Sequence, residues 1–338
     1  MIKSNLLSID LAKDVFQVAG FSHRRKVLFN KKFKRSELLA YMAQQPPTEV
    51  VMEACYSSHY WARCFEQLGH NVRLLPAQHV SAFLRGNKSD ANDTIAIGEA
   101  ADRPNIIPVP VKTVAQQDIQ CLHRMRSLVS DQRKALMSQA RGLLSEYGVI
   151  TARGHKGFRA LITKVTDPTD PSVSALLKEQ FRSILDQHER YTQRINELEK
   201  QLALIAKEQP ICQLLLTIPG IGVINASAIY CAIGNGSQFK HARDFAVWLG
   251  LTPRQRQSGN TFSSGAITKR GNAYLRTQLV HGARSMLCRC KDKTDRVSLW
   301  GNQLVARRGF NKACVAMAAR LARLCWILIQ KNQPYQAM

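Results

Sequence analysis

The first hundred residues alternate between short apolar segments and helical segments in an order that few folds accommodate. Three apolar segments follow one another directly, and after them helices and single apolar segments alternate. Short apolar runs bounded by turn residues are typical of buried strands. The expected strands are residues 5–10, 15–19, 27–29, 48–53 and 71–75, with helices over 36–44, 60–68 and around 87–93. This order predicts an α/β domain in which a strand meander continues into one mixed sheet.

Two of the expected strands, the first and the fourth, end in an acidic residue. Asp10 closes the first strand and Glu53 closes the fourth. If these strands are parallel neighbours, both carboxylates lie side by side at the carboxyl edge of the sheet, where open α/β sheets hold their ligands. Each acid taken singly could equally well cap a loop.

The segment Asn87–Asp93 opens a helical pattern and contains two more carboxylates. Asp90 and Asp93 are three residues apart, so a helix projects both from one face. The simplest interpretation is that they favour the helix N-terminus. If they join Asp10 and Glu53, the four like charges raise one another's pKa. A divalent cation relieves that repulsion, so we expect Mg²⁺, as a pair of ions suited to phosphodiester chemistry, with Mn²⁺ able to substitute.

The charge balance points to a polyanionic partner. The chain has 48 Lys and Arg against 24 Asp and Glu, a formal net charge of +24. Nucleic acid is the first candidate for such a surface. No membrane is expected, because the longest apolar run, 314–330, contains Arg320 and Arg323, and the N-terminus does not resemble a signal peptide. The nine cysteines form no Cys-x-x-Cys pair, as expected for reduced thiols in a cytoplasm.

The middle of the chain reads as a connector followed by long helices. Residues 102–113 are Pro-rich and extended, 116–147 form a long helix, and 151–175 read as irregular. The basic residues of the long helix, within 123–134, indicate either a solvated face or contacts to phosphates. An apolar seam at three-and-four spacing then suggests a coiled coil, formed either by folding back within the chain or by pairing two protomers. The seam consists of Phe181, Ile184, His188, Tyr191, Ile195, Leu198, Leu202 and Ile205.

A second, mostly helical domain begins near Pro210. Residues 218–222, Ile-Pro-Gly-Ile-Gly, have the pattern of a helix-hairpin-helix element, in which Gly220 and Gly222 let the backbone approach a phosphate. A plain packing turn between two helices is the alternative. Residues 252–260 read as a polar loop, and a final core helix is expected over 313–331. Residues 251–312 contain thirteen Lys and Arg against two Asp, which favours salt-dependent binding to phosphates.

Ser258 lies in that polar loop, next to Gly259 and close to Arg254 and Arg256. A serine in this setting is more often a turn residue than a nucleophile. No neighbouring His–Asp pair or Gly-x-Ser-x-Gly motif indicates a hydrolase triad.

Several motifs occur together and in an order that resembles one family. They are Ile9-Asp10-Leu11-Ala12-Lys13, Met52-Glu53-Ala54-Cys55, Asn87–Asp93, Ile218–Gly222, Gly250-Leu251-Thr252-Pro253-Arg254, and Ile267–Asn272 with Leu275-Arg276. Over nearly its whole length the chain resembles the DEDD transposases of bacterial insertion sequences, a family that includes pilin-gene-inverting recombinases. Tyr56 and Thr94 depart from that pattern, where a small residue and Ala are usual.

The resemblance implies a fold, a mechanism and partners. The N-terminal domain would be RNase H-like, similar to the Holliday-junction resolvase RuvC, and the family's four acids would be Asp10, Glu53, Asp90 and Asp93. Ser258 would be the nucleophile. A structured noncoding guide RNA, the bridge RNA, would pair with donor and target double-stranded DNA. The proteins would act as dimers and as dimers of dimers, with the acids and the serine of one site on different protomers.

These expectations define three domains: the DEDD domain over 1–110, a helical linker and coiled coil over 111–209, and a C-terminal transposase domain over 210–338. The expected function is RNA-guided recombination through a 5′-phosphoserine in a bacterial cytoplasm, near the nucleoid. Two alternatives remain: a metal-dependent junction endonuclease that uses activated water, and a non-enzymatic basic nucleic-acid-binding protein. The residues expected to contact nucleic acid are Lys88, Gly220, Gly222, Arg254, Arg256, Lys269, Arg270 and Arg276.

Overall fold

The computed structural model describes residues 4–87, 89–150 and 154–336 of the chain. Its contacts divide the chain into two compact units. The first comprises Met1–Gln116 with Ile233–Asp244, and the second comprises Gln117–Ala232 with Phe245–Met338. Each unit is described by itself.

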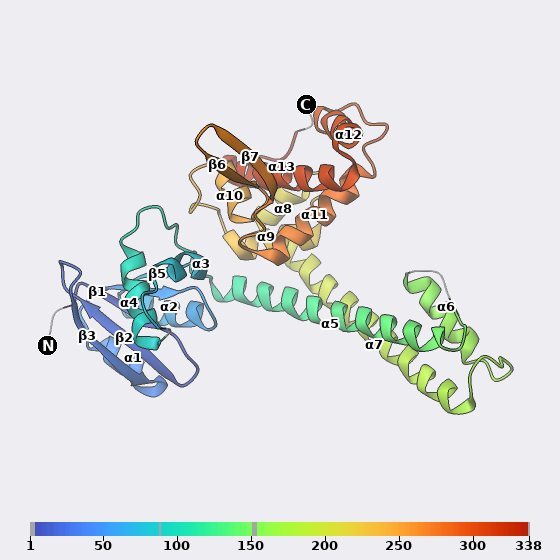
Figure 1. Cartoon of the computed structure of the whole chain (residues 1–338), viewed down its shortest axis with the longest axis horizontal. Helices are drawn as coiled ribbons and strands as arrows, with labels where there is room; N and C mark the ends of the chain where they lie inside the picture. The colour runs from blue at the N-terminus through green and yellow to red at the C-terminus, as the bar shows by residue number, and fades with distance from the viewer. Residues whose placement is uncertain (1–3, 88, 151–153, 337–338) are drawn as a thin grey trace. The chain divides into compact units, whose positions relative to one another are not determined.

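The first unit is built on a five-stranded mixed sheet (Figure 1). Its strands are β1 (Leu6–Asp10), β2 (Val15–Phe21), β3 (Val27–Lys34), β4 (Glu49–Glu53) and β5 (Asn71–Leu75), in the spatial order β3-β2-β1-β4-β5. The pairs β1–β2 and β2–β3 are antiparallel, whereas β1–β4 and β4–β5 are parallel. The predicted element order is confirmed. The first and fourth strands are parallel neighbours, which is the condition under which Asp10 and Glu53 were expected to lie side by side.

Helices cover both faces of this sheet, which is why its central strands are apolar without interruption. On one face, α1 (Arg35–Ala43) and α2 (Ser58–Gln67) bury Leu38, Met42, Trp61 and Phe65 against the strands. On the other face, α3 (Ala77–Val80), the short 3₁₀ turn Ser81–Phe83 and α4 (Asp90–Ala101) pack on the sheet. Their shared core with the strands consists of Leu6, Ala19, Phe21, Val51, Leu75, Val80, Ala96, Ile97, Ala100 and Ala101.

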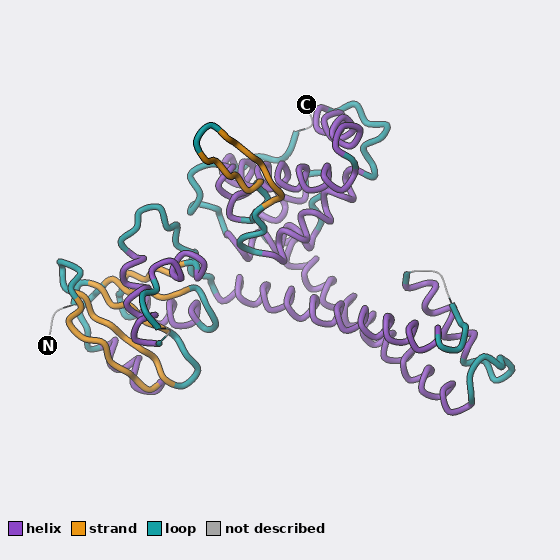
Figure 2. Tube along the Cα trace, in the orientation of Figure 1, coloured by secondary structure: helices purple, strands orange, loops and turns teal. Residues whose placement is uncertain are grey.

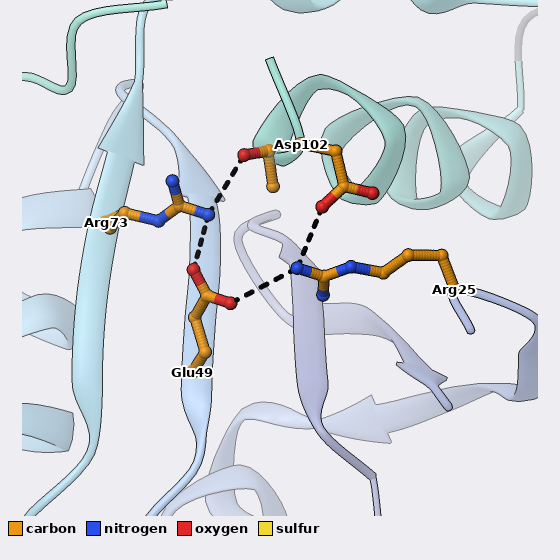
Figure 3. A network of polar contacts seen from close by, with 5 residues as sticks. Arg25, Glu49, Arg73 and Asp102 are labelled. Carbon is orange, nitrogen blue, oxygen red and sulfur yellow. Dashed lines mark hydrogen bonds and ion pairs between the residues drawn. The ribbon is translucent and has the colours of Figure 1, made fainter. Parts of the chain in front are cut away.

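A network of ion pairs joins segments at the amino end of β4, opposite to Glu53 (Figure 3). The guanidinium of Arg25, in the β2–β3 turn, lies 2.8 Å from Asp102 and 3.6 Å from Glu49. Arg73 of β5 pairs with Glu49 and also donates to the carbonyl of Ala101, at 3.1 Å. The network therefore connects the meander to the parallel half of the sheet and to the end of α4.

Replacing Glu49 with Gln is expected to lower the free energy of unfolding by about 1 kcal/mol, because the side chains are partly exposed and water screens the pairs. Urea unfolding at low and high salt measures the loss, which should shrink as salt rises. A loss that does not depend on salt would contradict an electrostatic role for this network.

The second unit is mostly helical (Figure 2). Its elements are α5 (Val114–Ser145), α6 (His155–Val165), α7 (Ala175–Glu208), α8 (Pro210–Leu216), α9 (Val223–Ile233), α10 (Ala242–Trp248), β6 (Pro253–Ser258), β7 (Thr261–Ile267), α11 (Ala273–Leu287), α12 (Arg296–Arg308) and α13 (Phe310–Lys331). The first residues of α5, the last of α9 and the start of α10 belong to the first unit.

Helices α5 and α7 run antiparallel. Arg126 lies 2.6 Å from Glu199, and farther along α5 Arg133 donates to the Thr192 hydroxyl at 3.1 Å. Several residues of the predicted seam pack inside the chain: Phe181 lies in a cluster with α5 and α6, and Leu202 in a cluster with α5 and α9. This agrees with the alternative in which the seam folds back. Coiled-coil pairing of two protomers stays a prediction.

Two predictions from the sequence are wrong. Residues 151–175 are not irregular throughout, because α6 buries Phe158, Leu161, Ile162 and Val165 on one side. Residues 252–260 are not a loop, because they contain β6, which pairs with β7 in an antiparallel hairpin around Gly259. Both strands are exposed almost throughout, so they show no apolar alternation, and only the backbone ladder defines them.

Helix α13 is the one described helix long and apolar enough to cross a membrane. Half of its apolar stretch is buried, and it packs against α8, α11 and α12 as a core helix does. The prediction that this helix belongs to the core is confirmed. All nine cysteines are free thiols, and five of them are buried.

His123 of α5 connects three helices of the second unit through its two ring nitrogens. Nε2 lies 3.0 Å from the Ser227 hydroxyl and Nδ1 lies 2.9 Å from the Tyr274 hydroxyl. Because Ser227 donates its own proton to the carbonyl of Val223, it accepts from Nε2–H, and Nδ1 accepts from Tyr274. Burial lowers the pKa of His123 to about 4. His123 therefore serves packing as a neutral ring and is not a phosphate contact.

This histidine should make stability fall on acidification. The unfolded chain takes up the proton near pH 6.5 and the folded chain only near 4, so stability is complete above pH 6.5 and is lost as pH falls between these values. The loss amounts to about 3 kcal/mol. The His123→Gln variant, which does not titrate at this position, should show a correspondingly flatter dependence of unfolding free energy on pH. Parallel pH profiles of the two proteins would contradict the assignment.

Candidate active site

The first pair of predicted acids lies at the carboxyl edge of the first unit's sheet. Asp10 is the last residue of β1 and Glu53 the last of β4. These strands pair in parallel, with Ile9 opposite Met52, so the next residue on each strand is an acid at the same level. The sequence predicted this placement on the condition that the two strands are parallel neighbours.

The second pair lies in the first turn of α4, which begins at Asp90. The Ser89 hydroxyl caps the helix by accepting from the Asn92 N–H, and Asp93 follows one turn after Asp90. A buried hydrogen bond of 2.7 Å from the Ser8 hydroxyl of β1 to the carbonyl of Thr94 fixes this turn against the strand that ends in Asp10.

Additional contacts hold the same turn of α4 in place. The Thr94 hydroxyl donates to the Asp90 carbonyl at 2.6 Å, so the threonine that departs from the family pattern fits inside the helix. The Asn30 amide of β3 donates to the Ala91 carbonyl at 3.0 Å. Sequence reasoning missed these contacts, since no local pattern connects residues 8 or 30 with 91–94.

The charges of the other three acids act on Asp10. The pKa of Asp10 is raised from 3.8 to about 6, first by burial and then by the charges of Asp93, Asp90 and Glu53, against a smaller opposite effect of the Leu11 N–H. The Oδ1 atom of Asp93 is buried and has no hydrogen-bond partner within the described chain.

This donor set fits a hard divalent cation, because carboxylate oxygens are the ligands that Mg²⁺ prefers. Within residues 4–87, 89–150 and 154–336, no three acidic, histidine or cysteine side chains already stand close enough together to hold one ion. The acids lie within electrostatic range of one another, so binding would draw their side chains together. The unpaired oxygen of Asp93 is the clearest sign of such a fit.

The loop after Glu53 contributes a thiol and an exposed ring. Burial, and then the charges of Glu53 and Asp10, raise the pKa of Cys55 to about 11, so its thiol stays protonated at neutral pH. Tyr56 is 85% exposed and precedes Ser57, whose φ of 65° is in the left-handed region. Tyr56 therefore does not fill the space between the acids.

The predicted nucleophile, Ser258, lies in the second unit. It is the last residue of β6, opposite Thr261 across the hairpin turn, and it is exposed. Arg256 is two residues earlier on the same strand, so both side chains project from one face of the hairpin. Arg254 is also exposed and donates to the Thr268 carbonyl at 3.4 Å.

The other predicted nucleic-acid contacts differ in how far the fold itself uses them. Lys269 and Arg270 are exposed in the loop before α11. Arg276 instead donates to the carbonyls of Leu249 and Arg270, at 2.9 and 3.1 Å, so one of its nitrogens holds that loop in place. Lys88 lies outside the described residues.

Gly220 and Gly222 lie in the turn between α8 and α9, where a helix-hairpin-helix element was expected. Gly220 has a φ of 86° and lies against Gly282 of α11, whereas Gly222 is exposed and a Cβ built on it would meet nothing within 4 Å. The two glycines therefore face different surroundings.

Two families match this chain. Residues 7–149 match the DEDD_Tnp_IS110 family, described as "Transposase", and residues 212–298 match the family described as "Transposase IS116/IS110/IS902 family". The first match contains all four acids, and the second contains Gly220, Gly222 and Ser258.

Several similar chains cover nearly the whole sequence, and others match a shorter part of it. A probable family 20 transposase of Pseudomonas aeruginosa is 42% identical over 98% of both chains. The transposase for insertion sequence element IS1111A of Coxiella burnetii is 38% identical over 98% of this chain and 91% of its own. A pilin gene-inverting protein of Moraxella bovis is 42% identical over 20% of this chain and 21% of its own.

Together with the mixed sheet and its edge of acids, these matches define a class, the transposases of insertion sequences, which cut DNA and transfer it. The chain belongs to the IS110/IS116 family of DEDD transposases. The resemblance seen in the sequence motifs is thereby confirmed.

Proposed function

We propose that this transposase is an RNA-guided, site-specific recombinase that moves its own insertion sequence through a covalent 5′-phosphoserine intermediate. The observation that carries the proposal is that Asp10 lies partly buried within electrostatic range of Glu53, Asp90 and Asp93, so that burial first and then their charges raise its pKa to about 6. The mixed sheet, with parallel β1 and β4 at its centre, supports an RNase H-like fold similar to RuvC.

The four carboxylates would hold Mg²⁺, as a pair of ions, on the phosphate to be cut. When bound, the metal supplies positive charge to the attacking and leaving oxygens of the transferring phosphate. The capped first turn of α4 and the Ser8–Thr94 hydrogen bond keep Asp90 and Asp93 in place for this task.

Ser258 would be the nucleophile. Its Oγ loses its proton and forms a bond to phosphorus, while the bond from phosphorus to the 3′ oxygen breaks and that oxygen leaves, protonated, as a 3′-hydroxyl. One phosphate ester replaces another, so the energy of the broken bond is kept for rejoining. Arg254 and Arg256 would compensate charge on the phosphate, since both lie on the strand that ends in Ser258.

The remaining parts of the proposal concern partners and organisation. A structured guide RNA would choose donor and target DNA by base pairing, as in other RNA-guided systems. The exposed cations Lys269 and Arg270 support contacts to either nucleic acid. Dimers and dimers of dimers would bring acids and serine together from different protomers. The division into domains 1–110, 111–209 and 210–338, and a site of action in the bacterial cytoplasm near the nucleoid, belong to the same proposal.

The test reconstitutes the reaction from its parts. The protein is mixed with Mg²⁺, donor and target DNA labelled on each strand, and RNA transcribed from the noncoding DNA beside the gene. We expect recombinant junctions and a protein–DNA adduct that withstands denaturant, both dependent on the RNA. Hydrolysed ends without adduct would favour the junction endonuclease instead. Binding without any cleavage would favour the non-enzymatic alternative.

A further inference from the structure

A cleft of about 720 Å³ lies in the first unit, where α1 and α2 begin. The residues that line it include Val15, Lys34, Arg35, Leu39, Tyr60 and Trp61. They come from the start of β2, the end of β3, α1 and the first turn of α2. None of the four candidate catalytic acids is among these lining residues.

Partly exposed apolar side chains converge on this cleft. Val15 and Leu39 are each 42% exposed, and Tyr60 is 50% exposed. The Tyr60 ring lies against the buried ring of Trp61, with the two ring centroids 5.3 Å apart and the planes at 79°. Single exposed apolar residues are ordinary on a protein surface, whereas several that line one cleft are typical of an interaction site. The cleft therefore offers an apolar floor on which a partner's apolar side chain is removed from water.

The charge of the lining is positive. Lys34 and Arg35 are exposed and form no ion pair within the part of the chain that the structure describes. The Arg35 guanidinium lies 5.2 Å from the centre of the Trp61 ring, and this cation–π contact keeps it beside the apolar floor. Asp14 is the acid of the lining. The nearby Glu37 carboxylate accepts from the Lys34 N–H at 2.9 Å, so the start of α1 already engages it.

More positive charge lies along β3, which is an edge strand of the sheet. Lys31 and Lys32 are exposed on this strand. Lysines on an edge strand also prevent sheets from pairing edge to edge, so these charges alone do not indicate a partner. The apolar cleft at the end of the strand is the second, independent observation. A segment bound in the cleft has these further cations beside it.

Charge and apolar surface together select the occupant. The whole chain has 48 Lys and Arg against 24 Asp and Glu, so a second copy presents a mostly basic surface, which a basic cleft repels. A nucleic-acid backbone meets the cations but has no apolar group for the floor. A peptide that combines carboxylates with a large apolar side chain complements both parts of the cleft.

We propose that this cleft docks an acidic peptide segment of another protein. One large apolar side chain of the segment packs against Leu39 and Tyr60, and its carboxylates pair with Lys34 and Arg35. The inference is independent of the proposed function, because neither the candidate catalytic acids nor the β6–β7 hairpin takes part. It adds a protein partner to the nucleic acids that the proposed function requires.

Binding is measured on the full chain by fluorescence anisotropy with three labelled synthetic peptides of equal length. The first peptide contains several aspartates and one central phenylalanine. In the second, alanine replaces the phenylalanine, and in the third, asparagines replace the aspartates. The protein variants are Leu39→Gln and the double variant Lys34→Gln/Arg35→Gln, all at exposed positions.

Each variant has a matched control in the same unit. Leu68→Gln changes a leucine that is 37% exposed at the far end of α2. Arg24→Gln/Lys26→Gln removes two exposed cations from the turn between β2 and β3, at the opposite end of β3 from Lys34. Sedimentation velocity and anisotropy with a labelled single-stranded oligonucleotide test the same variants for the other two occupants.

We expect the first peptide to bind the unchanged protein about tenfold more tightly than either of the other two. Leu39→Gln and Lys34→Gln/Arg35→Gln should each weaken its binding by about tenfold, and the controls by less than about twofold. Equal affinities of the three peptides for the unchanged protein would overturn the proposal, and this comparison needs no variant to fold. Variants of the cleft that alter self-association or oligonucleotide binding but leave peptide binding unchanged would overturn it as well.

Discussion

Replacing Asp10 with Asn is expected to reduce strand cleavage by about 1,000-fold or more, because the amide keeps the shape of the side chain but cannot replace the carboxylate as a ligand of the proposed metal. Binding of DNA and RNA should stay close to that of the unchanged protein, since the exposed cations are untouched. Cleavage is measured on end-labelled DNA in single-turnover conditions across a series of Mg²⁺ concentrations.

The thermal midpoint of the same variant without metal, compared with that of the unchanged protein, gives a second measurement. Because the pKa of Asp10 is raised from 3.8 to about 6, ionisation of this carboxylate destabilises the folded chain. The destabilisation builds up as pH rises from 3.8 and is complete above about 6. Asp10→Asn should therefore raise the thermal midpoint in EDTA at pH 7.5, and the gain should shrink as pH falls from about 6 toward 3.8, where the aspartic acid is itself neutral. Added Mg²⁺ should stabilise the unchanged protein more than the variant.

Glu49→Gln is the matched control for this acid. Glu49 is the first residue of β4, at the opposite edge of the sheet from Glu53, and its carboxylate pairs with Arg25 and Arg73. This variant should lose stability and keep its cleavage rate per folded molecule. If Asp10→Asn cleaved DNA at the original rate, the carboxylates would not form the active centre.

Replacing Ser258 with Ala is expected to remove the covalent protein–DNA adduct and to lower strand transfer by about 10⁴-fold or more, because the variant has no hydroxyl to attack phosphorus. Denaturing gels with 5′-labelled and 3′-labelled strands measure both: the adduct should contain the fragment downstream of the break, joined through its 5′ phosphate and seen with the 3′ label. The upstream fragment should end in a free 3′-hydroxyl. Binding to DNA and RNA should be unchanged.

Ser263→Ala is the control on the same hairpin, since Ser263 is exposed on β7 opposite Arg256. It should leave both adduct and strand transfer intact. An adduct formed undiminished by the Ser258 variant would place the nucleophile on another residue. If the unchanged protein and the Ser258→Ala variant both cleaved DNA without an adduct, and Asp10→Asn still abolished cleavage, the nucleophile would be metal-activated water.

The fold of the first unit was largely predictable because its signals are local. Each strand from β1 to β5 is a short apolar run, and coverage on both faces makes those runs continuous. Element order made a parallel pairing of β1 with β4 possible, and the structure shows that pairing and with it Asp10 and Glu53 at the same end of the sheet. The family motifs could name Ser258, whereas its local setting gave no chemical reason to choose it.

The errors occur where stability comes from backbone pairing or from distant partners. The β6–β7 hairpin is polar and exposed, so periodicity could not reveal it. Helix α6 did carry an apolar spacing, at residues 158, 161, 162 and 165, but glycines and prolines on either side obscured it. The basic stretch around His123 was interpreted either as a solvated face or as a phosphate contact, whereas three-dimensional packing shows that ring buried between Ser227 and Tyr274.

The sequence by itself determined the identities that chemistry needs: four carboxylates at the ends of elements, an excess of cations and a glycine turn, because these follow from residue type and short-range spacing. The tertiary structure decided which residues far apart in the sequence contact one another. The Ser8–Thr94 hydrogen bond helps to hold α4 against β1. The close approach of Gly282 to Gly220, but not to Gly222, distinguishes the two glycines of the turn. Such contacts arise from packing between segments far apart in the chain, and no local pattern encodes them.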